Sequence, residues 1–276
     1  GIAAYFMHLK GDPRIYTRTA LFPVLFVLLM LWGIGLSNPE AVTELPSWCT
    51  PDWENFATQR WIFDIFFGRV VVKNQKLVPK SGHLVFVANH RNMILDPGMV
   101  RYSCGRTGYY LAKHTLFLNK IQSWVFLKAG AIPVYRKQDD PNLTSKNKDT
   151  FDLAYNIFEE GKCLILFPEG ISLAGRALFK IKTGAARIAL NAELKNNFSL
   201  NLKIIPIGIN YSDPSRFKSD VYIKYGTPIS INEYKERAVD NFSDSVEDIT
   251  HRIEESLLDL TTNLSFIDLE DVIGYL

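Results

Sequence analysis

The chain of 276 residues is long enough to bury the core of one large domain or of two small ones. Its 47% hydrophobic and 22% charged residues exclude a disordered or collagen-like protein. Its three cysteines form no CxxC pair, so they provide neither a disulfide framework nor a zinc knuckle, which fits a reducing compartment.

The net charge of +2 is unevenly distributed along the chain. Residues 240–276 contain ten acids and one arginine, a net charge of −9, so the other 239 residues carry +11. A basic body favours an anionic partner such as phosphate, a lipid headgroup or nucleic acid. A solvated acidic helix beside an ordinary basic surface accounts for the same distribution without any partner.

The first predicted element is an uncharged apolar segment at residues 20–36. As a helix it would be about 26 Å long, slightly short of the roughly 30 Å hydrocarbon core of a bilayer. We expect a retained membrane segment that spans with strain or lies partway in the bilayer. A buried core helix is an open alternative, and so is a signal peptide, although no clean cleavage site follows the segment.

Seven aromatic side chains interleave with polar residues over residues 48–67. This density beside an apolar segment is typical of a helix at the level of the lipid headgroups, although core packing would use the same side chains. We therefore expect residues 1–68 to form membrane-associated helices.

From residue 69 onward, short β-branched stretches alternate with helical ones. The predicted strands cover residues 70–72, 84–88, 109–112, 131–135, 163–167, 203–209 and 221–225. The predicted helices cover residues 96–102, 116–127, 148–160 and 183–192. This alternation predicts an α/β domain over residues 69–276, with a largely parallel central sheet flanked by helices, behind the N-terminal membrane-anchoring element.

A histidine and an aspartate follow the predicted strand 84–88. His90 stands two residues after the strand, and Asp96 stands six positions later. On a straight helix these side chains would be roughly 120° apart, so a hydrogen bond between them requires a turn first, for which Asn92 suits a helix cap. If Asp96 accepts from one imidazole nitrogen, the other nitrogen can act as a base. A purely structural contact between the two residues remains an alternative.

Two further polar clusters follow predicted strands. After strand 163–167, a Pro/Gly turn projects Glu169 and precedes Ser172, Lys182 and other basic residues, which suit a phosphate near a helix start, although Gly170 fits an ordinary turn equally well. Strand 131–135 ends in Arg136, which is also better suited to a phosphate than to a core. Because ligands bind at the carboxyl ends of strands in open α/β sheets, three polar clusters at three strand ends indicate a functional site more strongly than any one of them does.

Taken together, these residues resemble the glycerolipid acyltransferase family, the glycerol-3-phosphate and lysophosphatidate acyltransferases. The family's blocks occur in order at residues 89–97, 130–136, 167–170 with 182–184, and 205–207, and Lys113 and residues 225–229 match as well. One departure is the spacing, because five residues separate His90 from Asp96 where four are common, as in a subgroup of glycerol-3-phosphate acyltransferases. Another is Leu173-Ala174, which replaces a His-Asp pair that frequently follows the serine.

The resemblance implies a mechanism. His90, oriented by Asp96, would take the proton from a glycerol hydroxyl that attacks an acyl thioester. The substrate-binding residues that it implies are Lys113, Arg136, Glu169, Gly170, Ser172, Lys182 and Pro206. Arg136, helped by the two lysines, would hold the acceptor's phosphate, while Glu169 and Gly170 would shape the glycerol site and Pro206 the acyl side.

The implied reaction is the transfer of a fatty acyl group from acyl-CoA or acyl-ACP to lysophosphatidate, which makes phosphatidate. Glycerol-3-phosphate and other lysophospholipids are alternative acceptors. We expect no metal and no bound cofactor, since the thioester is a co-substrate. The expected partners are a phospholipid membrane, the acceptor and the CoA or acyl-carrier-protein thioester, but no nucleic acid, with the catalytic domain facing the cytoplasm. The alternative of another class is an inactive acyltransferase fold that only binds anionic lipid.

Overall fold

A computed structural model of the chain describes residues 63–93, 95–106, 108–135, 154–170, 178–213 and 216–261. The apolar segment 20–36 and most of the aromatic stretch 48–67 lie outside these residues. No helix within the described ranges is both long and apolar enough to cross a membrane.

The strands form one eight-stranded sheet in the order β1-β7-β6-β2-β5-β3-β4, with β8 paired to β6. Their bounds are β1 Val70–Lys73, β2 Leu84–Ala88, β3 Gly108–Lys113, β4 Ala131–Val134, β5 Cys163–Leu166, β6 Lys203–Tyr211, β7 Val221–Tyr225 and β8 Ile229–Ser230. The strands from β6 to β4 run parallel to one another, whereas β7 and β8 run antiparallel to β6. The prediction of a largely parallel sheet is confirmed, and all seven predicted strands are present.

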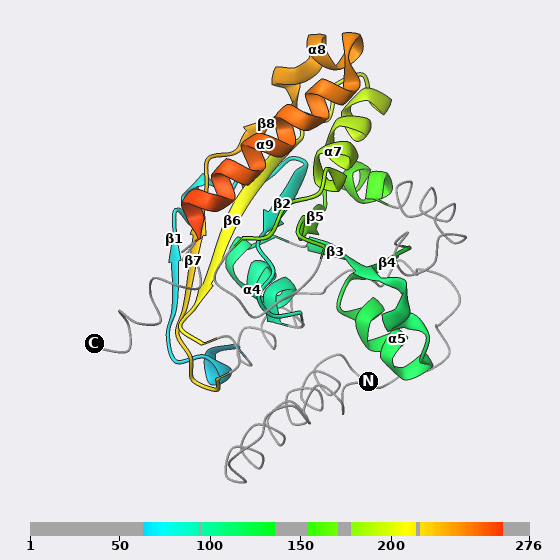
Figure 1. Ribbon diagram of the computed structural model, residues 1–276. Helices are drawn as coiled ribbons and strands as arrows, with labels where there is room; N and C mark the ends of the chain where they lie inside the picture. Colours follow the sequence, from blue (N-terminus) through cyan, green and yellow to red (C-terminus); the bar gives the residue numbers. More distant parts are fainter. Residues whose placement is uncertain are drawn as a thin grey trace.

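The helices connect and cover the strands (Figure 1). Their bounds are α4 Leu95–Cys104, α5 Lys120–Lys128, α7 Gly184–Lys195, α8 Lys235–Asp240 and α9 Phe242–Leu260, with short 3-10 helices η1 Gln75–Leu77, η2 His114–Phe117 and η4 Ile231–Tyr234. Residues 154–159, the described part of the predicted helix 148–160, are also helical.

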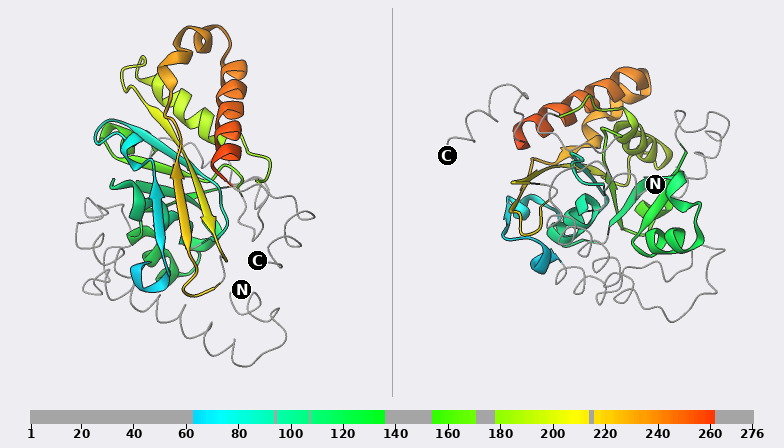
Figure 2. Two further views of the ribbon diagram at one scale, coloured as in Figure 1. Left: turned by 90° about the vertical axis from the view of Figure 1, so that its left-hand side faces the viewer. Right: turned by 60° about the horizontal axis from the view of Figure 1, so that its bottom comes forward.

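Helices cover both faces of the sheet because both faces are apolar. Every residue of β2 is buried, and its side chains alternate between two cores. Phe86 lies in one core with Met99 of α4, while Val85 lies in the other with residues of α7 and α9. Figures 1 and 2 show the same arrangement, with α7 and α9 together on one side of the sheet and α4 on the other.

The end of the predicted membrane-associated element packs on the domain that follows it. Phe63 and Phe67 are both 1% exposed and belong to the core that contains α4. Of the two interpretations of the aromatic stretch, core packing therefore holds for these two residues.

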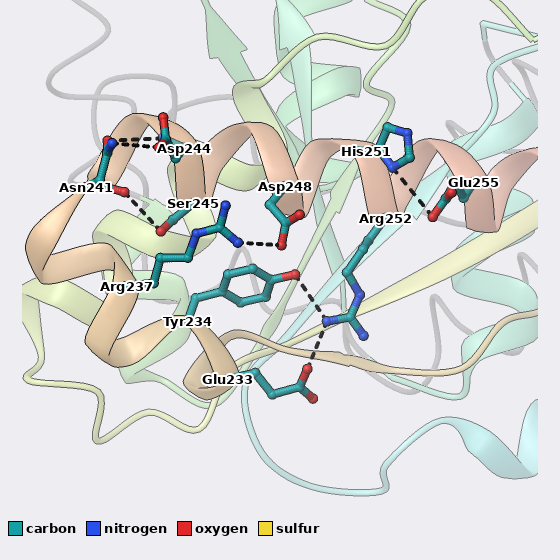
Figure 3. Close-up of polar contacts among 10 residues, drawn as sticks. All are labelled: Glu233, Tyr234, Arg237, Asn241, Asp244, Ser245, Asp248, His251, Arg252 and Glu255. Atoms are coloured by element: carbon teal, nitrogen blue, oxygen red, sulfur yellow. Dashed lines mark hydrogen bonds and ion pairs between the residues drawn. The ribbon is translucent and has the colours of Figure 1, made fainter.

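The acidic helix α9 covers the sheet with an apolar stripe. Val246, Ile249, Ile253, Leu257 and Leu260 are buried at the three- and four-residue spacing of one helix face. Figure 3 shows side chains of this helix in polar contacts, including an ion pair of Asp248 with Arg237 of α8 and one of Arg252 with Glu233 of η4. The interpretation of the acidic region as a solvated helix is confirmed for residues 242–260.

Candidate active site

Three parallel neighbours, β5, β2 and β6, deliver the polar residues of the candidate site. Strand β2 lies between the other two, so the carboxyl ends of all three strands meet at one edge of the sheet. His90 follows β2, Glu169 follows β5, and Tyr211 is the last residue of β6. The sheet thereby brings together residues that are far apart in the sequence, as is usual for ligand sites in open α/β folds.

The side chain of Asn89 continues the pairing between β2 and β6 after the backbone has left the sheet. Its amide nitrogen donates to the carbonyl oxygen of Ile209 at 2.9 Å, and its amide oxygen accepts from the Ile209 N–H at 2.7 Å. Asn89 is fully buried, so the two bonds satisfy groups that water does not reach. The chain can therefore turn toward α4 directly after β2.

A capped turn leads into α4 and closes the distance between His90 and Asp96. The Asn92 side-chain oxygen accepts from the N–H of Leu95 at 3.1 Å, as expected of a helix cap, and its carbonyl oxygen accepts from the N–H of Asp96 at 3.1 Å. Within this turn, His90 Nδ1 lies 2.9 Å from Asp96 Oδ2. The hydrogen bond that the spacing alone left open is present.

The carboxylate of Asp96 is fully buried and receives hydrogen bonds on both oxygens. Oδ2 accepts from His90 Nδ1 and, at 2.8 Å, from the N–H of Asn92, while Oδ1 accepts from the Tyr211 hydroxyl at 2.7 Å. Asp96 also lies in the first turn of α4, where the helix dipole favours negative charge. With its Nδ1 proton donated to Asp96, His90 keeps Nε2 as the nitrogen that can accept a proton.

Glu169 holds the backbone of His90. Its Oε1 accepts from the His90 N–H at 2.8 Å, and its Oε2 accepts from the N–H of Phe179 at 3.1 Å. Burial raises the pKa of Glu169, whereas the two backbone donors and the charge of Arg91 oppose this rise. The ring of Phe167 stacks on the His90 imidazole with 4.2 Å between centroids, so the imidazole is supported from the same turn.

Lys182 lies over the turn that carries Glu169. Its backbone N–H donates to the carbonyl oxygen of Pro168 at 2.9 Å, and its side chain covers Gly170, which has a φ of +68°. A Cβ atom on Gly170 would lie 2.6 Å from Lys182 Nζ. The positive φ favours glycine here, and any Cβ at this position would require the Lys182 side chain to move.

Comparison with known proteins shows to which family the chain belongs. A family model described as Acyltransferase matches residues 69–210, just over half of the chain. The chain belongs to the acyltransferase family. Together with the relatives described next, this match confirms the resemblance to glycerolipid acyltransferases that the motifs predicted.

Glycerol-3-phosphate O-acyltransferase 2 of Saccharomyces cerevisiae is 30% identical over 118 residues, which are 42% of this chain and 16% of the yeast protein. A probable 1-acyl-sn-glycerol-3-phosphate acyltransferase of Mycoplasma pneumoniae is 26% identical over 190 residues, which are 65% of this chain and 66% of that protein. The match therefore spans only about a sixth of the yeast relative's length.

A crystal structure of the 1-acyl-sn-glycerophosphate (LPA) acyltransferase PlsC from Thermotoga maritima has the same fold. Its TM-score to this chain is 0.57 at 17% sequence identity, and the alignment covers 87% of this chain and 96% of that chain.

The remaining predicted site residues of this acyltransferase-family chain occupy different places. Lys113 ends β3, which β5 separates from β2, and thus lies at the same edge of the sheet as His90. Pro206 lies inside β6 in register with Val87, rather than at the edge of the sheet. Arg136 and Ser172 lie outside the described residues.

Three residues of the candidate site were not assigned from the sequence, namely Asn89, Arg91 and Tyr211. Arg91 is 9% exposed, and although burial lowers its pKa, the charges of Glu169 and Asp96 oppose that shift. Asn89 and Arg91 belong to a recognised block, but nothing local shows that their side chains are buried. Tyr211 ends a strand whose predicted end was two residues too early, so the rule that sites follow strand ends could have found it.

Proposed function

We propose that this chain transfers a fatty acyl group from an acyl thioester to the free hydroxyl of lysophosphatidate, forming phosphatidate. The observation that carries the proposal is the 2.9 Å hydrogen bond between His90 Nδ1 and Asp96 Oδ2 at the carboxyl edge of the sheet. Family membership supports acyl transfer as the type of reaction.

The geometry supports a general-base mechanism. The Nε2 atom of His90 takes the proton of the acceptor hydroxyl as its oxygen attacks the thioester carbonyl, and His90 then returns this proton to the departing thiolate. Asp96 fixes the tautomer of the imidazole and stabilises the imidazolium that forms between the two steps. No covalent intermediate on the enzyme is required.

Basic residues at the same edge would bind phosphate. Lys182 lies beside the Glu169–Gly170 turn, and Lys113 ends a neighbouring strand of the parallel set. Together with Arg136 and Ser172 they would hold the phosphate of the acceptor. We assign Pro206 to the acyl side of the pocket and Glu169 to the glycerol side.

The proposed reaction suits a membrane-associated enzyme whose site faces the cytoplasm. Lysophosphatidate and phosphatidate both carry fatty chains, so an enzyme seated on a leaflet can exchange them without exposing those chains to water. The +11 body would favour anionic lipids and the phosphates of coenzyme A. Acyl-ACP is the alternative thioester donor.

Glycerol-3-phosphate is the second candidate acceptor. The yeast relative is named for glycerol-3-phosphate, and the Mycoplasma relative is named for 1-acyl-sn-glycerol-3-phosphate. The six-position step from His90 to Asp96 resembles a subgroup of glycerol-3-phosphate acyltransferases and favours glycerol-3-phosphate. The 190-residue match with the Mycoplasma relative covers more of both chains and favours lysophosphatidate.

A thiol-release assay with one acyl-CoA and a panel of lysophosphatidate, glycerol-3-phosphate and a second lysophospholipid tests the proposal. We expect the highest kcat/KM with lysophosphatidate, and acyl-ACP is then compared with acyl-CoA on that acceptor. A higher kcat/KM with glycerol-3-phosphate would show that glycerol-3-phosphate, and not lysophosphatidate, is the acceptor. Binding to anionic vesicles without thiol release from either donor would favour the lipid-binding module instead.

The substitution His90→Ala tests the base directly. We expect kcat to fall by about a hundredfold or more, because general-base catalysis contributes at least that much. The matched control is His251→Ala on the outer face of α9, where the side chain is 68% exposed, and it should leave turnover unchanged. A folded His90→Ala protein with near-normal turnover would rule out the proposed mechanism.

A further inference from the structure

A tyrosine beyond the recognised blocks completes the hydrogen bonding of the His–Asp pair. Tyr211 lies one residue past the segment that the family model matches, and its hydroxyl donates to Asp96 Oδ1 at 2.7 Å. We propose that Tyr211 is a positioning residue for acyl transfer, which holds the Asp96 carboxylate in the orientation that presents Oδ2 to His90. This inference rests on the function proposed above.

The argument begins with the freedom of the Asp96 side chain. The terminal torsion of an aspartate is broad and roughly two-fold, so donors on one oxygen alone leave the plane of the carboxylate weakly defined. On Oδ2, Asp96 accepts from His90 Nδ1 and from the N–H of Asn92. The Tyr211 hydroxyl binds the other oxygen from the opposite end of the carboxylate and thereby resists its rotation.

Tyr211 is itself held firmly enough to serve as a reference. Its backbone pairs with Val221 of β7, and its ring packs against Phe67 with 5.9 Å between centroids. Burial and the charge of Asp96 raise the pKa of Tyr211 well above its ordinary value, so the hydroxyl keeps its proton and remains a donor. The group that orients Asp96 is therefore anchored by the sheet and by the core.

Because Asp96 is buried, losing the hydrogen bond from the Tyr211 hydroxyl has a large free-energy cost. The residue is fully buried, and a buried carboxylate oxygen that loses its donor cannot replace it readily with water. A tilted Asp96 would orient the imidazole less well toward the attacking hydroxyl, while the binding of both substrates would be little affected. The expected signature is a loss in kcat rather than a rise in KM.

The test compares Tyr211→Phe with Tyr225→Phe in the chain of 276 residues. Phenylalanine keeps the ring packing in both cases and removes one hydroxyl. Tyr225 lies on the neighbouring strand β7, where its hydroxyl shares a buried hydrogen bond of 2.7 Å with Ser103 Oγ. The two variants thus lose the same atom and one side-chain hydrogen bond each, but only Tyr211→Phe removes a donor to Asp96.

We expect Tyr211→Phe to lower kcat by about ten- to a hundredfold, the range of one hydrogen bond to a charged group, with both KM values within about twofold of wild type. Tyr225→Phe should lose similar thermal stability and keep kcat within about twofold. If the wild type is active and Tyr211→Phe has an unchanged kcat, the positioning role of Tyr211 is wrong. An equal loss of kcat in both variants would also contradict that role. Neither result would contradict the proposed acyl transfer. A wild type without thiol release on any acceptor would instead contradict the proposed function.

Discussion

Backbone N–H groups determine where both carboxylates of the site lie. Glu169 accepts from the N–H groups of His90 and Phe179, and Asp96 accepts from that of Asn92. Backbone donors cannot rotate away as a long side chain can, so they fix the carboxylate oxygens that they bind, while the plane of the Asp96 carboxylate also depends on Tyr211. The glutamate of the Phe-Pro-Glu-Gly block thus supports the His90 backbone in addition to any contact with substrate.

The substitution Gly170→Ala tests the place of Lys182. A side chain at a φ of +68° costs about 1 kcal/mol of folding free energy, and the new Cβ would displace the Lys182 ammonium. We expect a higher KM for the phosphate-bearing acceptor in the thiol-release assay, with kcat less affected.

Gly161→Ala is the matched control for this change. Gly161 has the same φ of +68°, but no atom lies within 4 Å of its added Cβ. It should show the stability loss in urea denaturation without any change in KM. Equal KM values for the two variants would show that Lys182 does not bind the phosphate of the acceptor.

Among the elements, α9 shows how the acidic region serves the fold. Its apolar stripe packs in one core with α7, and its C-terminal end approaches β6 so closely that a Cβ on Gly208 would lie 2.2 Å from the Leu260 carbonyl oxygen. The N-terminal end is capped by Asn241, which accepts from the N–H of Asp244 (Figure 3). The acids thus lie on the outer face of a helix whose inner face covers the sheet.

The substitution Ile253→Ala tests this packing. Ile253 is 1% exposed, so removing its methyl groups should lower the free energy of unfolding by about 2–5 kcal/mol. Leu258→Ala on the same helix, at 45% exposure, should change it by less than about 0.5 kcal/mol. Urea denaturation measures both values, and similar losses in the two variants would show that α9 does not pack as described.

At the scale of the whole molecule, two features favour a membrane surface. One is the +11 charge of residues 1–239, and the other is the apolar segment 20–36, which lies outside the described part of the chain. A wash at high salt distinguishes the two features. At 1 M salt the attraction between charges is screened beyond about 3 Å, whereas the free energy gained by burying apolar surface is not weakened.

We expect the chain of 276 residues to stay with the membrane fraction when that fraction is washed with 1 M salt and no detergent. A variant with Leu28→Asp and Leu29→Asp places two charges in the apolar segment and should be released by the same wash. Clean release of the unaltered chain would contradict an embedded anchor and leave an electrostatic attachment.

Some contacts of the site could be predicted from the sequence, and others could not. The pairing of His90 with Asp96 could be proposed because it depends on one turn and one cap between residues six positions apart. The contact of Tyr211 with Asp96 joins residues 115 positions apart, and that of Glu169 with the His90 backbone joins residues 79 apart. Neither could be proposed without knowing which strands are neighbours.

The sequence by itself determined seven of the eight described strands, the family and the polar residues that follow β2 and β5, because strand patterns and motif spacing are local properties. Only the tertiary structure decided that β2 lies between β5 and β6, since strand order follows from how the two helical layers pack on the sheet. That order placed Glu169 and Tyr211 on either side of the His–Asp turn. Packing on the sheet also places the acids of residues 242–260, which the sequence allowed as a solvated helix, on the outer side of α9.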